Sequence, residues 1–223
     1  GGGQRQWRRS KTKTWTPVQV KAFFREAGSP DFNEVSRGSS LMSPYLIICP
    51  GIHEPQLTQD FLASLDLSSS WTEKILIFPA QDYPAYSAIH ILEFLQRHIG
   101  LVKTPIVLIG FSAGVVGAIA AAWGWQLLGG SIQALIAIDG WGVPLYGNFP
   151  IHRISHDYFT HWSSALLGAG EDSFYATPAI GHLDLWRSPC QCQGWWVQVP
   201  LGEQPPHRTY LTAAEFIIEL LAR

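Results

Sequence analysis

Ser112 lies at the centre of a five-residue segment, Gly-Phe-Ser-Ala-Gly, whose composition suits covalent catalysis. A serine hydroxyl acts as a nucleophile when a tight, strained turn projects it from the carboxyl end of a strand. Such a turn leaves no room for side chains two residues to either side, and Gly110 and Gly114 occupy those two positions. The pattern alone arises by chance roughly one time in ten in a glycine-rich chain of this length, so the flanking elements have to support it.

The segments on both sides of Ser112 have the composition of the required strand and helix. An apolar run rich in β-branched residues, 106–109, precedes the turn, and an alanine-rich stretch, 115–122, follows it. Together they predict a strand, a sharp turn and a helix with Ser112 at the apex. We therefore expect a nucleophile elbow here.

Apolar runs alternate with helical periodicities along the rest of the chain. The expected strands are 45–49, 75–78, 106–110, 134–138, 151–155, 173–176 and 195–199, and the expected helices are 55–66, 85–99, the stretch from the Ser112 turn to about 128, 159–167 and a last one behind the capping box Thr212 to Glu215. Strands that alternate with helices predict an α/β protein with a mainly parallel sheet and helices on both of its faces.

The candidate site residues lie at the carboxyl ends of the expected strands. Ligands of parallel sheets bind where strands end, and Gly51, Ser112 and Asp139 each follow a strand. This agreement does not depend on the motif around Ser112, so it supports the same site independently.

With its elbow on the third αβ unit, the chain resembles the α/β-hydrolase fold family of serine hydrolases over roughly residues 44–222. The resemblance implies a compact three-layer sandwich that lacks the two leading antiparallel strands of the family. The segment 140–150 is too short for a large lid domain, so the resemblance also implies an open site.

The resemblance implies a triad in the chain order serine, acid, histidine. Ser112 is the nucleophile, and His182, in the segment Gly-His-Leu-Asp-Leu, is the expected base. Two acids are candidates for orienting the imidazole. We favour Asp157, which follows the short strand 151–155, and keep Asp139, at the end of the strand 134–138, as the alternative.

The same resemblance implies an oxyanion hole formed by two backbone N–H groups. They belong to Ala113, which follows the serine, and to Ile52, in the loop after the first strand. His53 is a weaker candidate for lining the pocket. The apolar residues 141–146 either wall an acyl pocket or pack in the core, and the sequence does not separate these readings.

These residues predict a serine hydrolase that cleaves an ester or thioester with an apolar acyl group through an acyl-enzyme. Two alternatives stay open: an acyltransferase on the same site, and a non-catalytic lipid-binding or scaffold module of the same fold. We expect a small ester or lipid-like substrate as the partner, and no nucleic acid.

The length and the charge distribution favour one folded domain, 44–223, behind a basic N-terminal arm, 1–43. Residues 1–25 contain seven lysines and arginines and no acid, although the whole chain has a net charge of −2. Such a segment can contact anionic lipid, and more often it is simply solvated, which we favour. The expected location is the cytoplasm, with peripheral membrane contact through residues 1–25 as an added expectation.

No cofactor, metal site or disulfide framework is expected. The chain has neither a phosphate-binding loop nor a dinucleotide fingerprint, and its three cysteines lack a redox or zinc spacing. Three histidines, His152, His156 and His161, lie close together in the sequence, but on an expected strand His152 and His156 are too far apart for easy chelation. The uncharged stretch 104–133 is expected to be a buried strand and helix instead of a membrane span, because it contains the elbow turn and several glycines.

Overall fold

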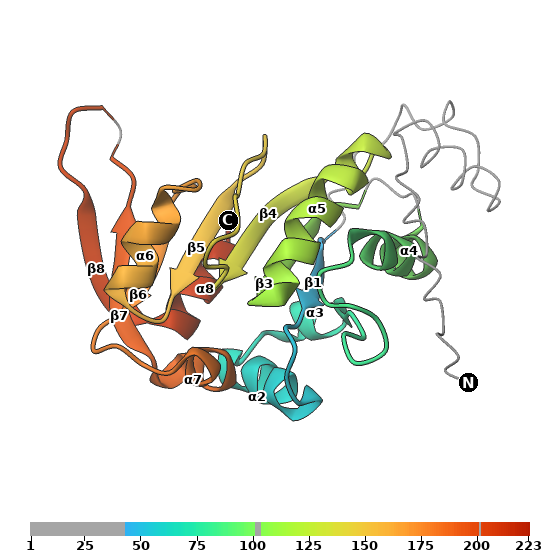
Figure 1. The fold of residues 1–223 in the computed structure, drawn as a ribbon, viewed down its shortest axis with the longest axis horizontal. Helices are drawn as coiled ribbons and strands as arrows, with labels where there is room; N and C mark the ends of the chain where they lie inside the picture. The colour runs from blue at the N-terminus through green and yellow to red at the C-terminus, as the bar shows by residue number, and fades with distance from the viewer. Residues whose placement is uncertain (1–42, 101–103, 201) are drawn as a thin grey trace, which may run out of the picture. The chain divides into compact units, whose positions relative to one another are not determined.

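Eight strands form one sheet in the computed structural model, which describes residues 43–100, 104–200 and 202–223. The strands are β1 (Tyr45–Cys49), β2 (Ile75–Ile77), β3 (Ile106–Phe111), β4 (Ile132–Ile138), β5 (Ile151–Ser155), β6 (Ser173–Ala176), β7 (Gln193–Gln198) and β8 (His207–Thr212), in the spatial order β2-β1-β3-β4-β5-β6-β7-β8 (Figure 1). The first six strands of that order are parallel, and β7 and β8 are antiparallel. The predicted, mainly parallel sheet is confirmed.

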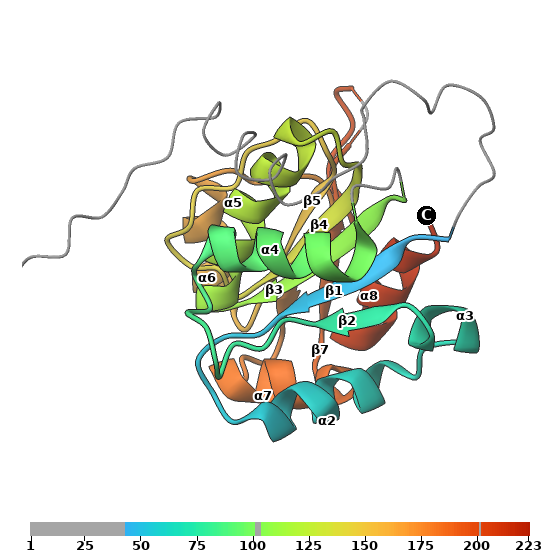
Figure 2. The same cartoon turned by 90° about the vertical axis from the view of Figure 1, so that its right-hand side faces the viewer.

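Helices cover both faces of this sheet, as predicted. They are α2 (Pro55–Leu65), α3 (Ser69–Thr72), α4 (Ala88–Ile99), α5 (Ala113–Leu127), α6 (Tyr158–Ala165), α7 (His182–Arg187) and α8 (Ala213–Leu221), with a 3-10 turn at Pro189–Gln191. Helices α4, α5 and α6 lie on one face and α2 and α8 on the other (Figure 2). The chain is therefore an α/β protein with the layers of a three-layer sandwich.

Strands β1, β3 and β4 form the centre of the sheet because their side chains are apolar on both faces. Their register pairs Cys49 with Gly110 and Phe111 with Ile138. The carboxyl ends of these three strands therefore meet at one edge of the sheet, where the loops after them lie close together.

Alternate strand residues point to the two helical layers. Val107 and Ile109 of β3 belong to a buried cluster with Phe61 of α2 and Phe216 of α8. On the opposite face α4 packs closely on α5. Gly117 of α5 leaves room for the Ile91 side chain of α4, with which a Cβ at that position would collide. This packing fixes α5, which begins directly behind Ser112.

Two elements differ from the sequence predictions. His182 is expected in a loop, but it is the first residue of the short helix α7. The chain returns along β7 as a further strand, β8, which the sequence pattern does not predict. The ends of several other elements shift by one to three residues, as in β2 and α4.

The uncharged stretch 104–133 folds as predicted into β3, the turn at Ser112 and α5. Within the described part of the chain, no helix combines the length and the hydrophobicity needed to cross a membrane. The predicted basic arm, through residue 42, and its contact with a membrane surface lie outside the described residues.

Candidate active site

Ser112 occupies a strained turn between β3 and α5. Its backbone angles, φ 54° and ψ −122°, lie in a region that residues with a side chain rarely adopt. Such strain costs on the order of 1–3 kcal/mol and is typically stored at functional sites. The N–H of Ser112 donates to the carbonyl of Ile138 at 3.0 Å, which ties the turn to the end of β4. The predicted strand, sharp turn and helix are present, with Ser112 at the turn.

Glycines around the turn are required by close backbone contacts. A Cβ at Gly114 would collide with the carbonyl oxygens of Cys49 and Pro50, at the end of β1. A Cβ at Gly51 would lie 3.1 Å from the Cβ of Ser112. The loop after β1 is therefore pressed against the serine turn, and only glycine fits at the contact.

Asp139 is the buried acid of the site. It follows β4 with a positive φ of 50°, and its side chain is only 1% exposed. Its Oδ2 accepts a hydrogen bond from Nδ1 of His182 at 2.7 Å, and its Oδ1 accepts one from the backbone N–H of His156 at 2.8 Å. An ionised carboxylate only accepts, so Nδ1 of His182 carries the proton and Nε2 is left free to take one.

The environment of Asp139 keeps it ionised. Burial raises the pKa of Asp139, but hydrogen bonds from His156 and His182, together with the charge of His156, outweigh burial and lower it below its ordinary value. The site therefore holds a buried negative charge directly behind the His182 ring.

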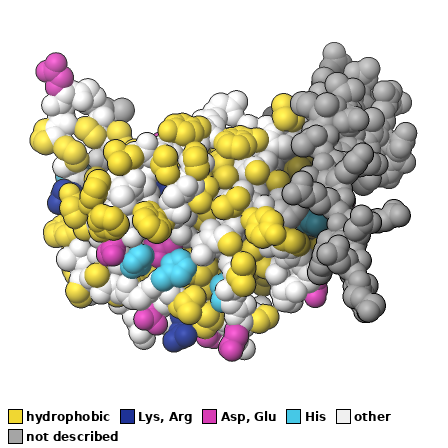
Figure 3. Space-filling model, in the orientation of Figure 1, with side chains coloured by type: hydrophobic (Ala, Val, Ile, Leu, Met, Phe, Trp, Pro, Cys, Tyr) yellow, Lys and Arg dark blue, Asp and Glu magenta, His cyan; other side chains and the backbone are white. Residues whose placement is uncertain are grey.

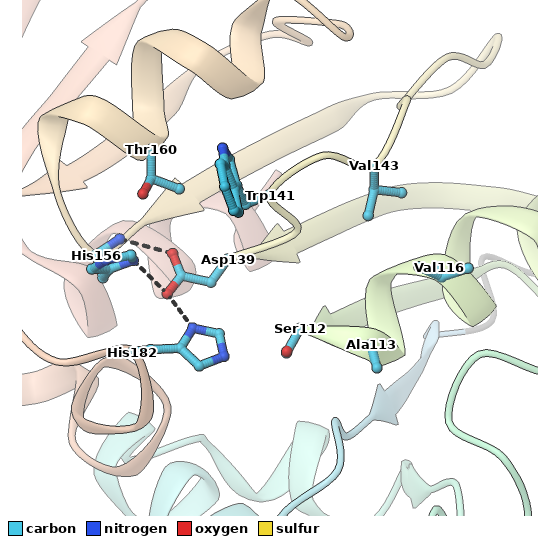
Figure 4. Close-up of a pocket in the computed structure, with 9 residues that line it drawn as sticks. All are labelled: Ser112, Ala113, Val116, Asp139, Trp141, Val143, His156, Thr160 and His182. Carbon is cyan, nitrogen blue, oxygen red and sulfur yellow. Dashed lines mark hydrogen bonds and ion pairs between the residues drawn. The ribbon is translucent and has the colours of Figure 1, made fainter.

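His182 is held between this carboxylate and an aromatic ring. Its imidazole stacks on Phe111 with the ring centroids 4.7 Å apart, and Phe111 in turn stacks on Trp186 of α7. Figure 4 shows the hydroxyl of Ser112 pointing toward the ring, on the side of Nε2. In the described residues no hydrogen bond joins Ser112 to His182; such contacts commonly shorten only when substrate binds.

Asp157, the acid favoured from the sequence, lies elsewhere in the site. Its carboxylate caps α6 by accepting the backbone N–H of Thr160 at 2.7 Å. Its other oxygen lies 3.3 Å from Nε2 of His156. Within the described part of the chain it is Asp139, the alternative, that contacts His182. The reason is that α6 begins directly after Asp157, so the side chain satisfies the first turn of that helix.

The two predicted oxyanion donors belong to the residue after Ser112 and to the loop after β1, which contacts the serine turn; of the two, only Ala113 lines the pocket. Ala113 is the first residue of α5 and lines the pocket, and its N–H belongs to the first turn, which has no acceptor within its own helix. Ile52 follows Gly51, and its side chain is 79% exposed. His53 does not line the pocket; its ring lies on Phe111, with centroids 5.6 Å apart.

These groups open into a pocket of about 420 Å³. It is lined by Ser112, Ala113, Val116, Asp139, Trp141, Val143, His156, Thr160 and His182 (Figure 4). Within the apolar segment 141–146, Trp141 and Val143 form the wall, whereas Leu145 packs in the core. Val116 and Thr160 were not predicted as site residues; their place on the first turns of α5 and α6 is the only signal they carry.

A buried arginine holds the pocket wall in place. Arg153 of β5 is 3% exposed and has carbonyl oxygens as its hydrogen-bond acceptors. It donates to Val143 at 2.8 Å and to Gly168 at 2.6 Å, and also reaches Gly140 and Leu167. It therefore ties the loop after β4 to the loop after α6.

The segment that supplies the pocket lining from Ser112 to Val143 carries little charge, whereas on the side of His182 the side chains of Asp184 and Arg187 are exposed. Between residues 104 and 155 the only Asp, Glu, Lys or Arg residues are Asp139 and Arg153, and both are buried. Trp141 of the wall is 64% exposed, and Phe159 and Trp162 of α6 are about half exposed. Figure 3 shows hydrophobic side chains spread over this face of the molecule. The pocket mouth is thus suited to an uncharged, apolar compound.

Asp139, His156 and His182 are also the described side chains close enough together to share a metal ion. Their spacing, however, is short: the Nδ1 atoms of His182, which is hydrogen-bonded, and of His156, which is not, both lie only 2.7–2.8 Å from one carboxylate oxygen. Ligands about 2.0–2.2 Å from one tetrahedral zinc ion would stand more than 3 Å apart. Neither His152, which bonds to the carbonyl of Asp172, nor His161 joins this cluster.

The fold and the site together define an α/β protein with a strained serine, a buried acid and an imidazole at one sheet edge. No protein-family model matches the sequence, and no curated protein matches it either. The chemistry of the site therefore has to carry the functional argument.

Proposed function

We propose that this protein is a serine hydrolase of the α/β-hydrolase type that cleaves esters or thioesters of apolar acyl compounds. The observation that carries the proposal is the strained Ser112, whose hydroxyl faces the His182 ring, which is itself hydrogen-bonded to the buried Asp139. Strain at the apex of a strand-turn-helix has no packing benefit of its own, so its retention favours a chemical role.

Acylation starts when Oγ of Ser112 attacks the carbonyl carbon of the ester and Nε2 of His182 takes the hydroxyl proton. Asp139 stabilises the imidazolium that forms. The N–H groups of Ala113 and Ile52 donate to the oxyanion, each typically contributing about 3 kcal/mol to transition-state stabilisation. His182 then protonates the leaving alkoxide or thiolate, and the acyl group stays on Ser112.

Deacylation repeats these steps with water as the nucleophile. His182 takes a proton from water, the oxygen attacks the acyl carbon, and Ser112 leaves as its hydroxyl with the proton returned by His182. The side chain of His182 is 42% exposed, so water reaches it freely. This access favours hydrolysis over acyl transfer to an alcohol, and product analysis with a competing alcohol separates the two outcomes.

The substrate class follows from the walls of the pocket. Val116, Trp141 and Val143 offer apolar contacts, and no charged group other than the site's own Asp139 and His side chains lines the space. A charged acyl group would lose its hydration there without gaining a partner. We therefore expect neutral acyl groups of moderate size.

The test is covalent labelling with a fluorophosphonate, followed by turnover of p-nitrophenyl esters. Ser112→Ala abolishes both signals, and Ser70→Ala, at an exposed serine of α3, leaves both unchanged. Wild-type protein that is folded, yet neither labels nor turns over any neutral ester, would support the non-catalytic lipid-binding or scaffold alternative. Activity that survives Ser112→Ala but disappears with a chelator would replace the proposal with metal-dependent hydrolysis.

A further inference from the structure

Four aromatic rings form a continuous stack that begins in the core and ends at His182. The imidazole of His182 lies on the ring of Phe111, with the centroids 4.7 Å apart. Phe111 lies on Trp186 at 4.8 Å, with the two rings only 5° from parallel, and Trp186 lies on Phe61 at 3.9 Å. Among the described residues no ring contact joins His182 to Trp186, so the Phe111 ring separates the two. We call these four rings the aromatic stack.

Two members of the aromatic stack come from the same short helix. His182 and Trp186 are four residues apart on α7, which places their side chains on the same side of that helix. Between them they hold Phe111, which is the last residue of β3 and the direct neighbour of Ser112. The segment of the proposed nucleophile and the segment of the proposed base are therefore joined by side-chain contacts that exist without a substrate.

Trp186 anchors the aromatic stack in the core. Its side chain is fully buried, and its Nε1–H donates to Oγ1 of Thr58 at 3.3 Å. Thr58 and Phe61 both belong to α2, and α7 lies beside α2 in both views (Figures 1 and 2). Packing on one helix and a hydrogen bond to the same helix thus hold the Trp186 ring in place.

The imidazole of His182 has weaker support of its own. His182 is the first residue of a helix of six residues, and Gly181 before it has no side chain to cap that helix. The His182 side chain is 42% exposed. Its hydrogen bond to Asp139 fixes Nδ1 but leaves the ring free to tilt about that bond. Contact with the flat face of Phe111 removes this remaining freedom.

The same rings contact the loop after β1. The ring of His53 lies against Phe111 and Trp186, with centroid distances of 5.6 and 6.1 Å. His53 directly follows Ile52, the second predicted oxyanion donor. Phe111 and Trp186 are therefore in contact with, or adjacent to, the segments that carry all three parts of the proposed chemistry.

We propose that Trp186 is a positioning residue: through Phe111 it holds the imidazole of His182 in the orientation that directs Nδ1 to Asp139 and Nε2 to Ser112. This inference rests on the proposed function, in which His182 transfers the proton of Ser112. Reacting groups have to stay within about 0.5 Å of their working geometry, and a displacement of about 1 Å can slow a reaction about a hundredfold. Trp186 does not line the pocket, so its loss lowers kcat and leaves KM unchanged.

The test compares the same substitution at two fully buried tryptophans. Trp186→Leu removes the ring behind Phe111, and Trp125→Leu, in α5 and outside the aromatic stack, is the matched control for lost packing. Hydrolysis of a p-nitrophenyl ester is measured per active site, counted with a fluorophosphonate, so that unfolded protein does not contribute. We expect kcat of Trp186→Leu to fall about ten- to a hundredfold with KM within about twofold of wild type. The kcat of Trp125→Leu is expected to stay within about twofold.

Trp186→Phe is the conservative variant, because it returns an aromatic ring to the position behind Phe111 and loses only the Nε1–H. Its kcat is expected to recover to within about threefold of wild type. An unchanged kcat in Trp186→Leu overturns the inference, and so does an equal decrease in Trp186→Leu and Trp125→Leu. A rise in KM with an unchanged kcat also overturns it, since the effect would then be on substrate binding.

A second pair of variants decides the matter if Trp186→Leu does not fold. Phe111→Leu removes the ring that lies on His182 and keeps an apolar strand residue. Phe174→Leu is its control, because Phe174 is an equally buried strand residue that stacks on Phe216 at 5.9 Å, outside the aromatic stack. The kcat per active site is expected to fall by about tenfold or more in Phe111→Leu and to stay within about twofold in Phe174→Leu. Equal kcat values for these two variants contradict the proposed role of the rings.

A measurement without substrate separates this inference from the proposed function. Crystal structures of Phe111→Leu and Phe174→Leu are compared at the His182 ring. We expect the ring to be tilted or to occupy more than one orientation in Phe111→Leu, and to keep its single orientation and its hydrogen bond to Asp139 in Phe174→Leu. An unchanged His182 ring in Phe111→Leu refutes the inference. If the wild type hydrolyses no ester, the proposed function fails, but these structures still decide whether the aromatic stack orients His182.

Discussion

Replacement of Asp139 by asparagine tests the central ion pair of the site. The buried carboxylate lies 2.7 Å from Nδ1 of His182, and in the proposed mechanism it stabilises the imidazolium formed in the transition state. Opposite unit charges about 4 Å apart, centre to centre, attract by about 4 kcal/mol at the effective dielectric of such a site. Loss of that attraction corresponds to a decrease of about a thousandfold in kcat. The amide also favours the wrong tautomer of His182, which acts in the same direction.

The assay is steady-state hydrolysis of a p-nitrophenyl ester. Asp157→Asn serves as the control, because it removes the other candidate acid while keeping the cap of α6, and its kcat is expected to stay within about threefold of wild type. Thermal unfolding checks that Asp139→Asn is folded. A thousandfold loss in the Asp157 variant with a near-normal Asp139 variant would refute the assignment and return the acid role to Asp157.

Three further predictions address packing, specificity and acid stability. Gly114→Ala is expected to lower the free energy of unfolding by about 3 kcal/mol, because its Cβ collides with carbonyl oxygens at the end of β1, and denaturant titration measures the loss. Trp141→Ala is expected to raise KM for long acyl esters about three- to tenfold and to leave kcat for acetate esters unchanged. An equal effect on esters of both chain lengths would contradict the place of Trp141 in the pocket wall. Burial raises the pKa of Asp172, but hydrogen bonds from Arg223 and Trp196 outweigh burial and lower it overall. The ionised Asp172 therefore stabilises the folded protein above the unfolded pKa near 3.9, and this stabilisation is lost as the pH falls through the folded pKa. Asp172→Asn should therefore cost about 1–2 kcal/mol at neutral pH, and unfolding curves of the two proteins should converge in strong acid.

The elbow and the centre of the sheet were predictable because local signals and the fold agree there. The run 106–109 is apolar on both faces, as a central parallel strand must be, and the two glycines around Ser112 are required by the turn. The capping box of α8 was equally readable, since Thr212 and Glu215 bond to each other's backbone as the pattern predicts. In these segments a few neighbouring residues determine the structure.

The choice between the two acids depended on contacts between distant segments. Spacing before His182 favoured Asp157, but the decisive partner is set by how β4, β5 and α7 converge. One local signal did point the other way: a helix was expected from residue 159, and an aspartate just before a helix is its natural cap. The contact between His156 and Asp139 left no such signal, because Asp139 follows a different strand, β4.

The helix α7 and the strand β8 were missed for different reasons. Gly181 precedes α7 without any side-chain cap, so nothing in the sequence marks where that helix begins. Strand β8 has the sequence His-Arg-Thr-Tyr-Leu-Thr, which is mostly polar because β8 is a border strand of the sheet and none of its residues is buried. Its pairing with β7 is a tertiary interaction that periodicity does not report.

The polar character of β8 affects whether copies of the chain associate through the border strands of their sheets. Within the described residues no strand pairs with the outer side of β2 or of β8, and the backbone groups of such border strands invite a strand of another copy to add on. At one border β2 is only three residues long, and at the other His207 and Arg208 stand on the strand with their side chains exposed. Short or charged borders make poor templates for the addition of a strand, so both described borders of the sheet disfavour edge-to-edge association.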